Sequence, residues 1–448
     1  MLRVAVVGSG PSGVYAAQAL VQQTAVPDVR VHILDRLPCP YGLVRYGVAP
    51  DHEKIKSLQN NLRSVLEDEH IDFLGNVEAG AQGLAPARLL ELYHAVVYCV
   101  GAARDRRLGI PGEDLPGSHS ATDFVSWYSA HPDAVAGGFP LGGPSAVVIG
   151  VGNVAVDVAR ILARGADELR PTDVPEPALA ALAASGVRDV HMVGRRGPSG
   201  AKFTTKELRE LGALPGADVL VEPADLALET AYADPEAVPA LVRRNLLVVR
   251  EWAARRPTGR ARRIHVRFFL RPVEVLERGG RAAGVRFERT VPDDRGGVRG
   301  TGAYEDIEAQ LVLRAVGYRG VPTAGLPFDA DRGIVPNEAG RVLRDGMPSP
   351  GEYVAGWIKR GPTGVIGTNR PCAKETVASL LEDAARLAAR PVAADPLAEL
   401  RAAGHRPVAW PGWLAIESAE QALGRTLGRR SVKIADWQGL LTAADAAD

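Results

Sequence analysis

Residues 2–13 read LRVAVVGSGPSG, and this stretch decides the fold. Its first six residues are mostly aliphatic, which is typical of a parallel β-strand covered on both faces. Gly8, Gly10 and Gly13 then open a helical pattern that runs to about Gln22. A strand, a GxGxxG turn and a helix in this order predict a dinucleotide-binding unit, because the glycine turn and the helix amides let a diphosphate approach.

Asp35 has the spacing that such a unit needs. It ends a second apolar run, Val29–Leu34, and lies 22 residues beyond Gly13. An acid at this distance accepts hydrogen bonds from the ribose hydroxyls of the adenosine half. Dinucleotide binding is therefore favoured over an empty turn of the same shape.

A second unit of this kind begins in the middle of the chain. The apolar run 146–149 leads into GVGNVA at 150–155, and the run 190–193 leads into Gly194, Arg195 and Arg196. An NAD site would place an acid at that strand end, whereas paired guanidinium groups suit a 2′-phosphate. NADP is favoured, and two solvated surface arginines are the alternative.

The order of the remaining patterns predicts an α/β fold in which the second Rossmann-like domain is inserted into a discontinuous first one. Alternation from 264 to 316 predicts antiparallel hairpins attached to the second domain. The apolar run 311–316 ends in Gly317, where we expect the chain to return. A last strand end near 353–356 precedes a glycine-rich loop and a helix over about 373–389.

Composition excludes several classes of protein. The 448 residues hold 53 Lys+Arg and 53 Asp+Glu, so no global basic field recruits nucleic acid or anionic lipid. Cys39, Cys99 and Cys372 form no CxxC pair, which argues against a structural zinc, a redox dithiol and an iron–sulfur cluster. The first strand begins at Leu2, so we expect no leader and a cytoplasmic location. We also expect no membrane insertion and a monomer.

Two dinucleotide units without a separate substrate domain suggest that one holds a flavin and the other delivers NADPH. The expected chemistry is hydride transfer from the nicotinamide to flavin N5. A disulfide reductase is excluded because it needs a dithiol.

Four strings of sequence carry a specific resemblance. They are CPYGLVRYGVAPDH at 39–52, GRRGP at 194–198, FTTKELRE at 203–210 and GWIKRGPTGVIGTN at 356–369. In order and over nearly the whole chain, they resemble the adrenodoxin-reductase-type NADPH–ferredoxin reductases, including bacterial members. The resemblance implies an FAD domain at 1–103 and 324–448 and an NADP domain at 104–323. It also implies single-electron transfer from reduced FAD to a ferredoxin that feeds a cytochrome P450 or another iron–sulfur-dependent enzyme.

The resemblance also places binding residues. FAD contacts fall at Ser12, Asp35, Leu43 and Ala79, with Ser12 and Leu43 acting mainly through their backbones. Contacts around the isoalloxazine fall at Trp357, Gly364, Val365 and Ile366, with Gly364 also near the nicotinamide. NADP contacts fall at Val151, Gly152, Asn153, Val154, Arg195, Arg196 and Glu207. Val151 stands where relatives usually have an amide side chain, which removes one polar contact, and Arg106 is a weaker candidate for the diphosphate.

His52 and Glu210 match a family pair near the nicotinamide and the flavin. Hydride transfer needs no general acid, so we assign them orientation, electrostatic tuning or proton supply to reduced flavin. Taken alone, His52 after a Pro-Asp turn is more typical of a capping residue, and the resemblance favours a role in the site.

The chain has no net charge, but one stretch of its sequence is strongly basic. Ten arginines lie between Arg243 and Arg271, against the single acid Glu251. Ferredoxins of this class are acidic, so a basic face could steer their encounter, with Arg243 and Arg244 as preferred docking residues. A solvated face and nucleic-acid binding are the alternatives, and no nucleic-acid-binding module accompanies the run.

Three other functions remain open from sequence alone. A flavin monooxygenase would oxygenate a small substrate, but its FxGxxxH-type string is missing. A glutamate-synthase-like reductase subunit usually carries a cysteine-rich cluster segment. A nucleotide sensor would bind NADPH without turnover.

Overall fold

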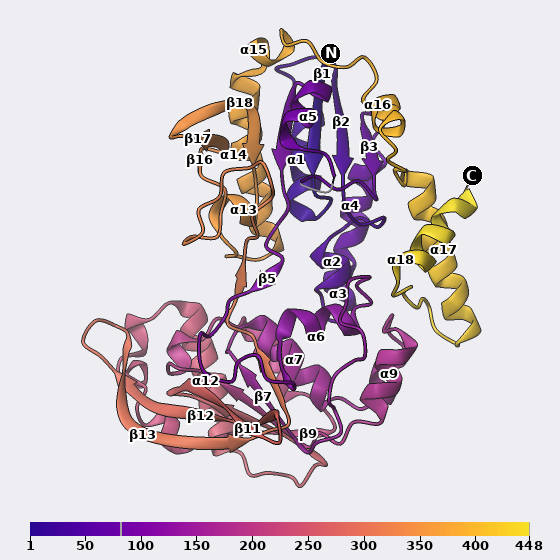
Figure 1. Cartoon of the computed structure of the whole chain (residues 1–448). Coiled ribbons are helices and arrows are strands. Elements are labelled where there is room, and N and C mark those ends of the chain that lie inside the picture. Colours follow the sequence, from indigo (N-terminus) through magenta and orange to yellow (C-terminus); the bar gives the residue numbers. More distant parts are fainter. Residues whose placement is uncertain (81–82, 448) are drawn as a thin grey trace. The chain divides into compact units, whose positions relative to one another are not determined.

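The structure is a computed structural model that describes residues 1–80 and 83–447 (Figure 1). It divides into two compact units. Unit 1 comprises Met1–Val48, His52–Arg104 and Tyr318–Asp448, and unit 2 comprises Ala49–Asp51 and Asp105–Gly317. The chain returns to unit 1 after Gly317, where the apolar run 311–316 ends, and six residues before the boundary at 323/324 that the resemblance implies.

Unit 1 is built on a seven-stranded sheet in the order β16-β17-β18-β4-β1-β2-β3. Its strands are β1 (Leu2–Val7), β2 (Val29–Leu34), β3 (Ile71–Leu74), β4 (Ala95–Tyr98), β16 (Asn337–Glu338), β17 (Arg341–Arg344) and β18 (Met347–Val354). The central strands pair in parallel and β1 is almost wholly buried, as its continuous apolar run requires. The parallel strands thereby bring their carboxyl ends, and the turns that follow them, to one edge of the sheet.

Helices of unit 1 cover this sheet and extend beyond it. They are α1 (Pro11–Gln22), α2 (Leu43–Tyr46), α3 (Glu53–Lys56), α4 (Leu58–Leu66), α5 (Pro86–Leu92), α13 (Trp357–Arg360), α14 (Asn369–Glu382), α15 (Ala384–Ala388), α16 (Pro396–Ala402), α17 (Trp410–Thr426) and α18 (Trp437–Ala444). Figure 1 shows α17 and α18 side by side in yellow. The predicted helix over 373–389 is two helices, since α14 ends at Glu382 and α15 follows.

Unit 2 holds a six-stranded sheet in the order β6-β14-β7-β8-β10-β9. Its strands are β6 (Ser118–Ser120), β7 (Ser145–Ile149), β8 (Asp189–Val193), β9 (Ala217–Val221), β10 (Arg262–Arg267) and β14 (Leu311–Arg314). The helices of the unit are α6 (Ala121–Tyr128), α7 (Asn153–Ala163), α8 (Ala166–Leu169), α9 (Glu176–Ala183), α10 (Thr205–Gly212), α11 (Pro223–Leu226) and α12 (Ala240–Ala254).

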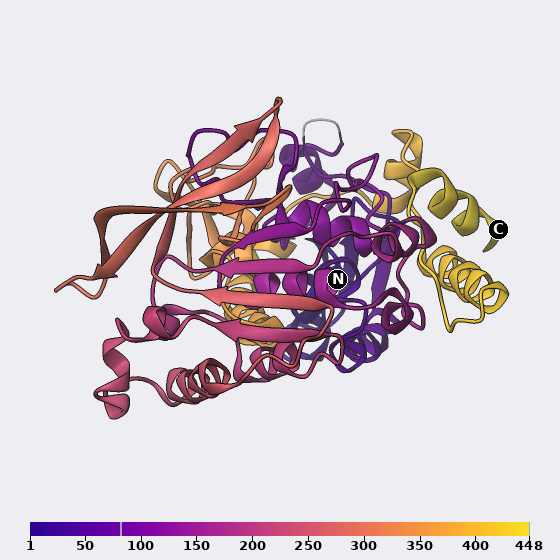
Figure 2. The same cartoon turned by 90° about the horizontal axis from the view of Figure 1, so that it is seen from below.

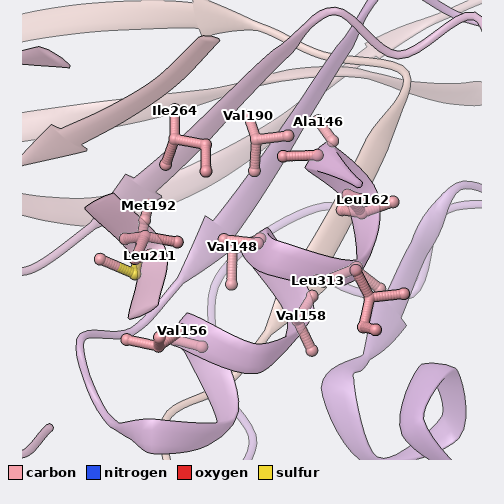
Figure 3. Packing of buried hydrophobic residues seen from close by; sticks show 14 of the residues in the cluster. Ala146, Val148, Val156, Val158, Leu162, Val190, Met192, Leu211, Ile264 and Leu313 are labelled. Carbon is pink, nitrogen blue, oxygen red and sulfur yellow. The ribbon is translucent and has the colours of Figure 1, made fainter. Parts of the chain in front are cut away.

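The core of unit 2 lies between these strands and α7. Val156, Val158 and Leu162 of α7 are buried together with aliphatic side chains of β7, β8, β10 and β14 (Figure 3). Burial of this apolar surface fixes where α7 begins, and with it the position of the turn that precedes the helix.

The predicted hairpin region is partly wrong. Only β11 (Leu270–Arg278), β12 (Arg281–Pro292) and β13 (Val298–Glu308) form an antiparallel sheet, drawn in salmon tones in Figure 2. β10 and β14, which flank it in sequence, pair in parallel with the main sheet. Their short apolar runs fit either kind of pairing, and only contacts with distant strands decide between them.

Within the described residues, no helix is long and apolar enough to cross a membrane. The same residues contain no cluster of His, Cys, Asp or Glu suited to hold a metal ion. All three cysteines are buried and free of disulfides.

Candidate functional site

The first glycine turn joins β1 to α1 and leaves no room for a side chain at Gly8 or Gly13. Gly8 has a φ of 106°, and a Cβ there would lie 2.6 Å from the carbonyl oxygen of Cys99. A Cβ on Gly13 would lie 1.8 Å from the carbonyl oxygen of Gly8. α1 begins after Gly10 without a side-chain cap. The turn therefore fits a diphosphate that approaches the helix N-terminus closely.

Asp35 is fixed beside this turn. Its Oδ2 accepts hydrogen bonds from Ser9 N at 2.7 Å and Ser9 Oγ at 2.5 Å, and its Oδ1 accepts one from Leu37 N at 2.9 Å. Burial raises the pKa of Asp35 even though these hydrogen bonds favour the carboxylate. Asp35 Oδ1 accepts a single hydrogen bond and keeps a second lone pair, which suits a ribose hydroxyl.

Two further predicted FAD contacts lie close to Asp35 and to the glycine turn. Val77 N donates to the carbonyl oxygen of Asp35 at 2.8 Å, and Ala79 follows two residues later. Ser12 is buried in the first turn of α1, and a Cβ on Gly356 would lie 2.4 Å from its Oγ. The end of β18 therefore meets α1 through a glycine.

The loop 39–46 presents Leu43 next to the first glycine turn. Tyr41 N donates to the carbonyl oxygen of Ser9 at 3.1 Å, and a Cβ on Gly42 would lie 3.0 Å from the Cα of Gly10. Leu43 is the first residue of α2, and it is 39% exposed, which is high for a leucine. The contact with FAD that the resemblance implies for Leu43 is mainly through its backbone, next to residues whose backbones lie against this turn.

A buried ion pair holds this loop, and the sequence analysis did not predict it. Arg45 Nη2 donates to Glu420 Oε1 of α17 at 2.6 Å, and both side chains are at most 5% exposed. Lys433 Nζ donates to the carbonyl oxygen of Arg45 at 2.7 Å, and the Arg45 guanidinium lies 5.1 Å from the ring centroid of Trp413. Segments nearly 400 residues apart meet here, which no local pattern reveals.

The predicted isoalloxazine contacts follow β18 in one closed loop. Trp357 Nε1 and Arg360 Nη2 both donate to the carbonyl oxygen of Thr363 at 3.2 Å. Gly364 has a φ of 83°, and a Cβ there would lie 2.6 Å from Thr368 Oγ1. Tyr318 packs against Trp357 with ring centroids 5.3 Å apart.

Val365 and Ile366 complete this loop. Val365 N donates to Thr368 Oγ1 at 3.1 Å, and the Val365 side chain is 60% exposed. Ile366 packs against the core of unit 1. The loop thus offers both an apolar surface and a fixed backbone.

His52 has the backbone position of a helix cap. Its carbonyl oxygen accepts hydrogen bonds from Ile55 N and Lys56 N at 3.0 Å, but its side chain does not cap α3. The preceding residue, Asp51, belongs to unit 2 and pairs there with Arg160 and Arg164 of unit 2. Asp51 is thereby held within unit 2.

The second glycine turn joins β7 to α7 in unit 2. Gly150 has a φ of 142°, and a Cβ there would lie 2.2 Å from the carbonyl oxygen of Ala315. α7 begins after Gly152 without a side-chain cap. Asn153 and Val154 form its first turn, so their backbone amides lie where a diphosphate would bind.

The side chain of Asn153 has a structural partner. Its Oδ1 accepts a hydrogen bond from Thr204 N at 2.9 Å, and Lys202 N donates to the carbonyl oxygen of Val151 at 2.8 Å. The glycine turn is thus tied to the segment 202–204 that leads into α10. The predicted contacts of Val151 and Asn153 with the nucleotide are left to their backbones and to Asn153 Nδ2.

Arg195 and Arg196 follow β8 and are both exposed. Their carbonyl oxygens accept hydrogen bonds from Thr290 Oγ1 at 2.8 Å and Phe269 N at 3.2 Å, which fix the backbone. Within the described residues, neither guanidinium is paired with a carboxylate. Two cations on a rigid backbone suit a phosphate better than they suit the ribose of NAD.

α10 carries the two predicted acids of unit 2. Thr204 caps the helix, and its Oγ1 donates to Glu207 Oε2 at 2.5 Å. One turn further, Glu210 is partly exposed and lies 3.8 Å from Lys206 Nζ. Glu210 and His52 belong to different units, so their action as a pair stays a prediction. Arg106 is exposed, and its backbone N donates to the carbonyl oxygen of Gly317 at 2.9 Å.

Comparisons with known proteins assign the chain to a family. The family model described as pyridine nucleotide-disulphide oxidoreductase matches residues 2–205. The chain is 46% identical over 452 residues to the NADPH-ferredoxin reductase FprA of Mycobacterium tuberculosis, with 98% of both sequences covered. The chain belongs to the NADPH–ferredoxin reductases.

Two further relatives extend this assignment. This reductase is 40% identical to the mitochondrial NADPH:adrenodoxin oxidoreductase of Arabidopsis thaliana, over 99% of the chain and 95% of that protein. The solved structure of Mycobacterium tuberculosis FprA in complex with NADPH matches with a TM-score of 0.93 and 44% identity, over 99% of both chains. The predicted family and the predicted α/β fold with two Rossmann-like domains are confirmed.

The arginine run of this reductase is less basic than its local sequence suggests. Five of the ten arginines pair with carboxylates, four of which lie outside the window: Arg243–Glu236, Arg255–Glu251, Arg263–Asp189, Arg267–Glu305 and Arg271–Glu288. Arg260 and Arg262 donate to backbone carbonyl groups, and Arg250 lies over the ring of Tyr232. In the described part of the chain, Arg244 and Arg256 alone of the ten have no recorded side-chain partner.

Proposed function

We propose that the chain is an NADPH–ferredoxin oxidoreductase that holds FAD in unit 1 and NADPH in unit 2. The observation that carries this assignment is the contrast between the two strand ends. One ends in the half-buried acid Asp35, and the other ends in Arg195 and Arg196, which in the described residues pair with no carboxylate. FAD, when bound, supplies the conversion between a hydride and single electrons.

In unit 1 the chain binds and orients FAD. The amides after Gly8 and Gly10 receive the diphosphate, Asp35 accepts from the ribose, and Ala79 lies beside the adenine. Trp357 and the segment 364–366 surround the isoalloxazine, with Tyr318 packed against the indole of Trp357. Leu43 contacts FAD mainly through its backbone. The close backbone approaches at the glycines support this assignment.

In unit 2 the chain binds NADPH and selects it over NADH. The turn 150–154 receives the diphosphate at the N-terminus of α7, and Arg195 and Arg196 bind the 2′-phosphate. Glu207, held by Thr204, accepts from a ribose hydroxyl. Arg106 is a weaker candidate for a second diphosphate contact.

His52 and Glu210 have supporting roles in the hydride and proton transfers. We assign them to orient the nicotinamide, to tune the local field or to supply a proton to reduced flavin.

The electron acceptor in this proposal is a small acidic ferredoxin. It docks near Arg243 and Arg244 on α12, where Arg244 and the apolar side chains of Leu241 and Leu247 are exposed. The reduced ferredoxin then supplies a cytochrome P450 or another iron–sulfur-dependent enzyme. A monomeric state and a cytoplasmic location are part of the same proposal.

Steady-state assays test the proposed function. We expect NADPH-dependent reduction of cytochrome c to require added ferredoxin, and NADPH to be preferred to NADH. Equal NADPH oxidation with and without ferredoxin, coupled to an oxygenated product, would instead support a monooxygenase. Nucleotide binding without any turnover would support a sensor.

A further inference from the structure

Lys202 lies against the second glycine turn. Its backbone N donates to the carbonyl oxygen of Val151 at 2.8 Å. Its Cβ is 3.8 Å from the position that a Cβ on Gly152 would occupy. The lysine stem therefore begins in van der Waals distance of the residue that precedes α7.

The backbone around Lys202 is fixed on both sides. Thr204 N donates to Asn153 Oδ1 at 2.9 Å, and Asn245 Nδ2 of α12 donates to the carbonyl oxygen of Phe203 at 3.0 Å. Thr205 Oγ1 also donates to Asn245 Oδ1, at 2.6 Å. A segment held by the glycine turn and by α12 places Lys202 at a defined distance from the turn.

In the described residues, the ammonium group of Lys202 is available to bind a ligand. The residue is exposed, and among the described residues its ammonium has no recorded ion pair or hydrogen bond. Lys206, one turn along α10, lies 3.8 Å from Glu210 by contrast. An ammonium group has three donors and binds phosphate as a mobile point charge.

The position of Lys202 distinguishes between the two phosphate sites of the nucleotide, the diphosphate and the 2′-phosphate. A diphosphate binds at the N-terminus of the helix that follows the glycine turn, here α7 after Gly152. The 2′-phosphate binds at the end of the next strand, where Arg195 and Arg196 stand. Lys202 is tied to the first of these places by Val151 and Gly152.

We propose that Lys202 binds the diphosphate of NADPH, an assignment that rests on the proposed function and adds a cation to it. The lysine neutralises charge that NADPH and NADH share. It therefore raises the affinity for both nucleotides without changing the preference between them, whereas Arg195 and Arg196 set that preference.

Binding titrations of the oxidised holoenzyme test this proposal with two probes. NADP⁺ carries the diphosphate, and 2′-AMP carries the 2′-phosphate without it. We expect Lys202→Met to weaken NADP⁺ binding about tenfold, as for loss of a charge-assisted hydrogen bond, and to change 2′-AMP binding less than about twofold. Lys202→Arg should retain NADP⁺ binding within about threefold, and Arg195→Ala should weaken both probes.

The matched control is Arg295→Met. Arg295 is an exposed cation in the turn between β12 and β13 of the same unit, and its loss should change neither probe. Unchanged NADP⁺ binding by Lys202→Met, or equal weakening of both probes, would overturn the proposal. Wild-type protein that binds no NADP⁺ and oxidises no NADPH would overturn the proposed function as well.

Discussion

At the scale of single residues, we propose that Arg195 and Arg196 set the preference for NADPH over NADH. They stand at the strand end where an NAD site would have an acid, and within the described residues no carboxylate neutralises them. Their backbone is held by Thr290 and Phe269, so the two guanidinium groups start from a fixed place. Charge-assisted contacts with phosphate are the strongest hydrogen bonds available to such side chains.

Replacing either arginine should reduce the preference for NADPH. We expect Arg195→Ala and Arg196→Ala each to lower kcat/KM for NADPH by about 10- to 100-fold, because a hydrogen bond to a charged group contributes about 1.5–3 kcal/mol. The kcat/KM for NADH should change little, and Arg295→Ala is the control. An unchanged ratio of the two values would show that the 2′-phosphate binds elsewhere.

His191 should make unit 2 sensitive to acid. It stacks on His265 with ring centroids 4.4 Å apart, and the charges of Asp189, Arg267 and Glu305 also affect its pKa. Burial, and then the charge of His265, lower the pKa of His191 to about 4. An unfolded histidine has a pKa of about 6.5, so between about pH 6.5 and pH 4 the unfolded state binds more protons.

Above about pH 6.5, His191 is neutral in both the folded and the unfolded state, so it does not reduce the free energy of unfolding. As the pH falls from about 6.5 toward 4, the unfolded state takes up the proton first and the free energy of unfolding falls. The expected loss is of the order of 3 kcal/mol in the free energy of unfolding. Denaturant midpoints measured at pH 7 and pH 4.5 should differ less in His191→Gln than in the wild type. His70→Gln, at a 43% exposed side chain, is the control, and equal effects of both variants would contradict the account.

Residues with a local cause were predictable, and residues with distant partners were not. Gly8, Gly13 and Asp35 follow from the spacing of one strand, one turn and one helix. The amide oxygen of Asn153 accepts a hydrogen bond from Thr204, 51 residues away. Four of the ten arginines of the run pair with acids beyond its own window. A count within a window cannot see such partners, because the fold brings them together.

At the scale of elements, α17 holds the loop that carries Leu43. The pair Arg45–Glu420 is almost fully buried, while Glu417 on the same helix pairs with Arg63 at half-exposed positions. Removing one partner of a buried pair leaves the other charge without compensation. The two glutamates therefore form a matched comparison on one helix.

Glu420→Ala should destabilise unit 1 by about 3–5 kcal/mol, whereas Glu417→Ala should cost about 1 kcal/mol or less. Because Arg45 lies two residues after Leu43, the first variant should also lose FAD during dialysis. Denaturant unfolding and the ratio of bound flavin to protein measure both effects. Equal effects of the two variants would show that the buried pair does not hold the loop.

The elements themselves were predicted unevenly. Strands next to a glycine turn, such as β1 and β7, have clear local signals. β10 and β14 were assigned to antiparallel hairpins because short apolar runs do not reveal the direction of pairing. β3 and the helices α16 to α18 were not predicted, since their burial depends on the rest of unit 1.

At the scale of the whole molecule, the chain is neutral but its charge is unevenly spread. The exposed cations of α12 and the following segment still include Arg244 and Arg256, although five arginines of the run pair with carboxylates. A local positive field speeds encounter with an acidic partner, and salt screens it.

Ferredoxin-dependent reduction of cytochrome c should therefore slow several-fold as ionic strength rises from about 0.02 to 0.3 M, where the Debye length falls below about 10 Å. Direct reduction of ferricyanide, which needs no ferredoxin, should change much less. Arg244→Ala should flatten the salt dependence of the first reaction alone. Equal salt dependence of the two reactions would remove electrostatic steering by this face.

The most direct test of the central claim follows the flavin itself in an anaerobic stopped-flow experiment. Mixing the holoenzyme with NADPH should bleach the yellow absorbance near about 450 nm, and about two equivalents of oxidised one-electron ferredoxin should restore it. Absence of bleaching with NADPH, or bleaching that ferredoxin does not reverse, would contradict the account.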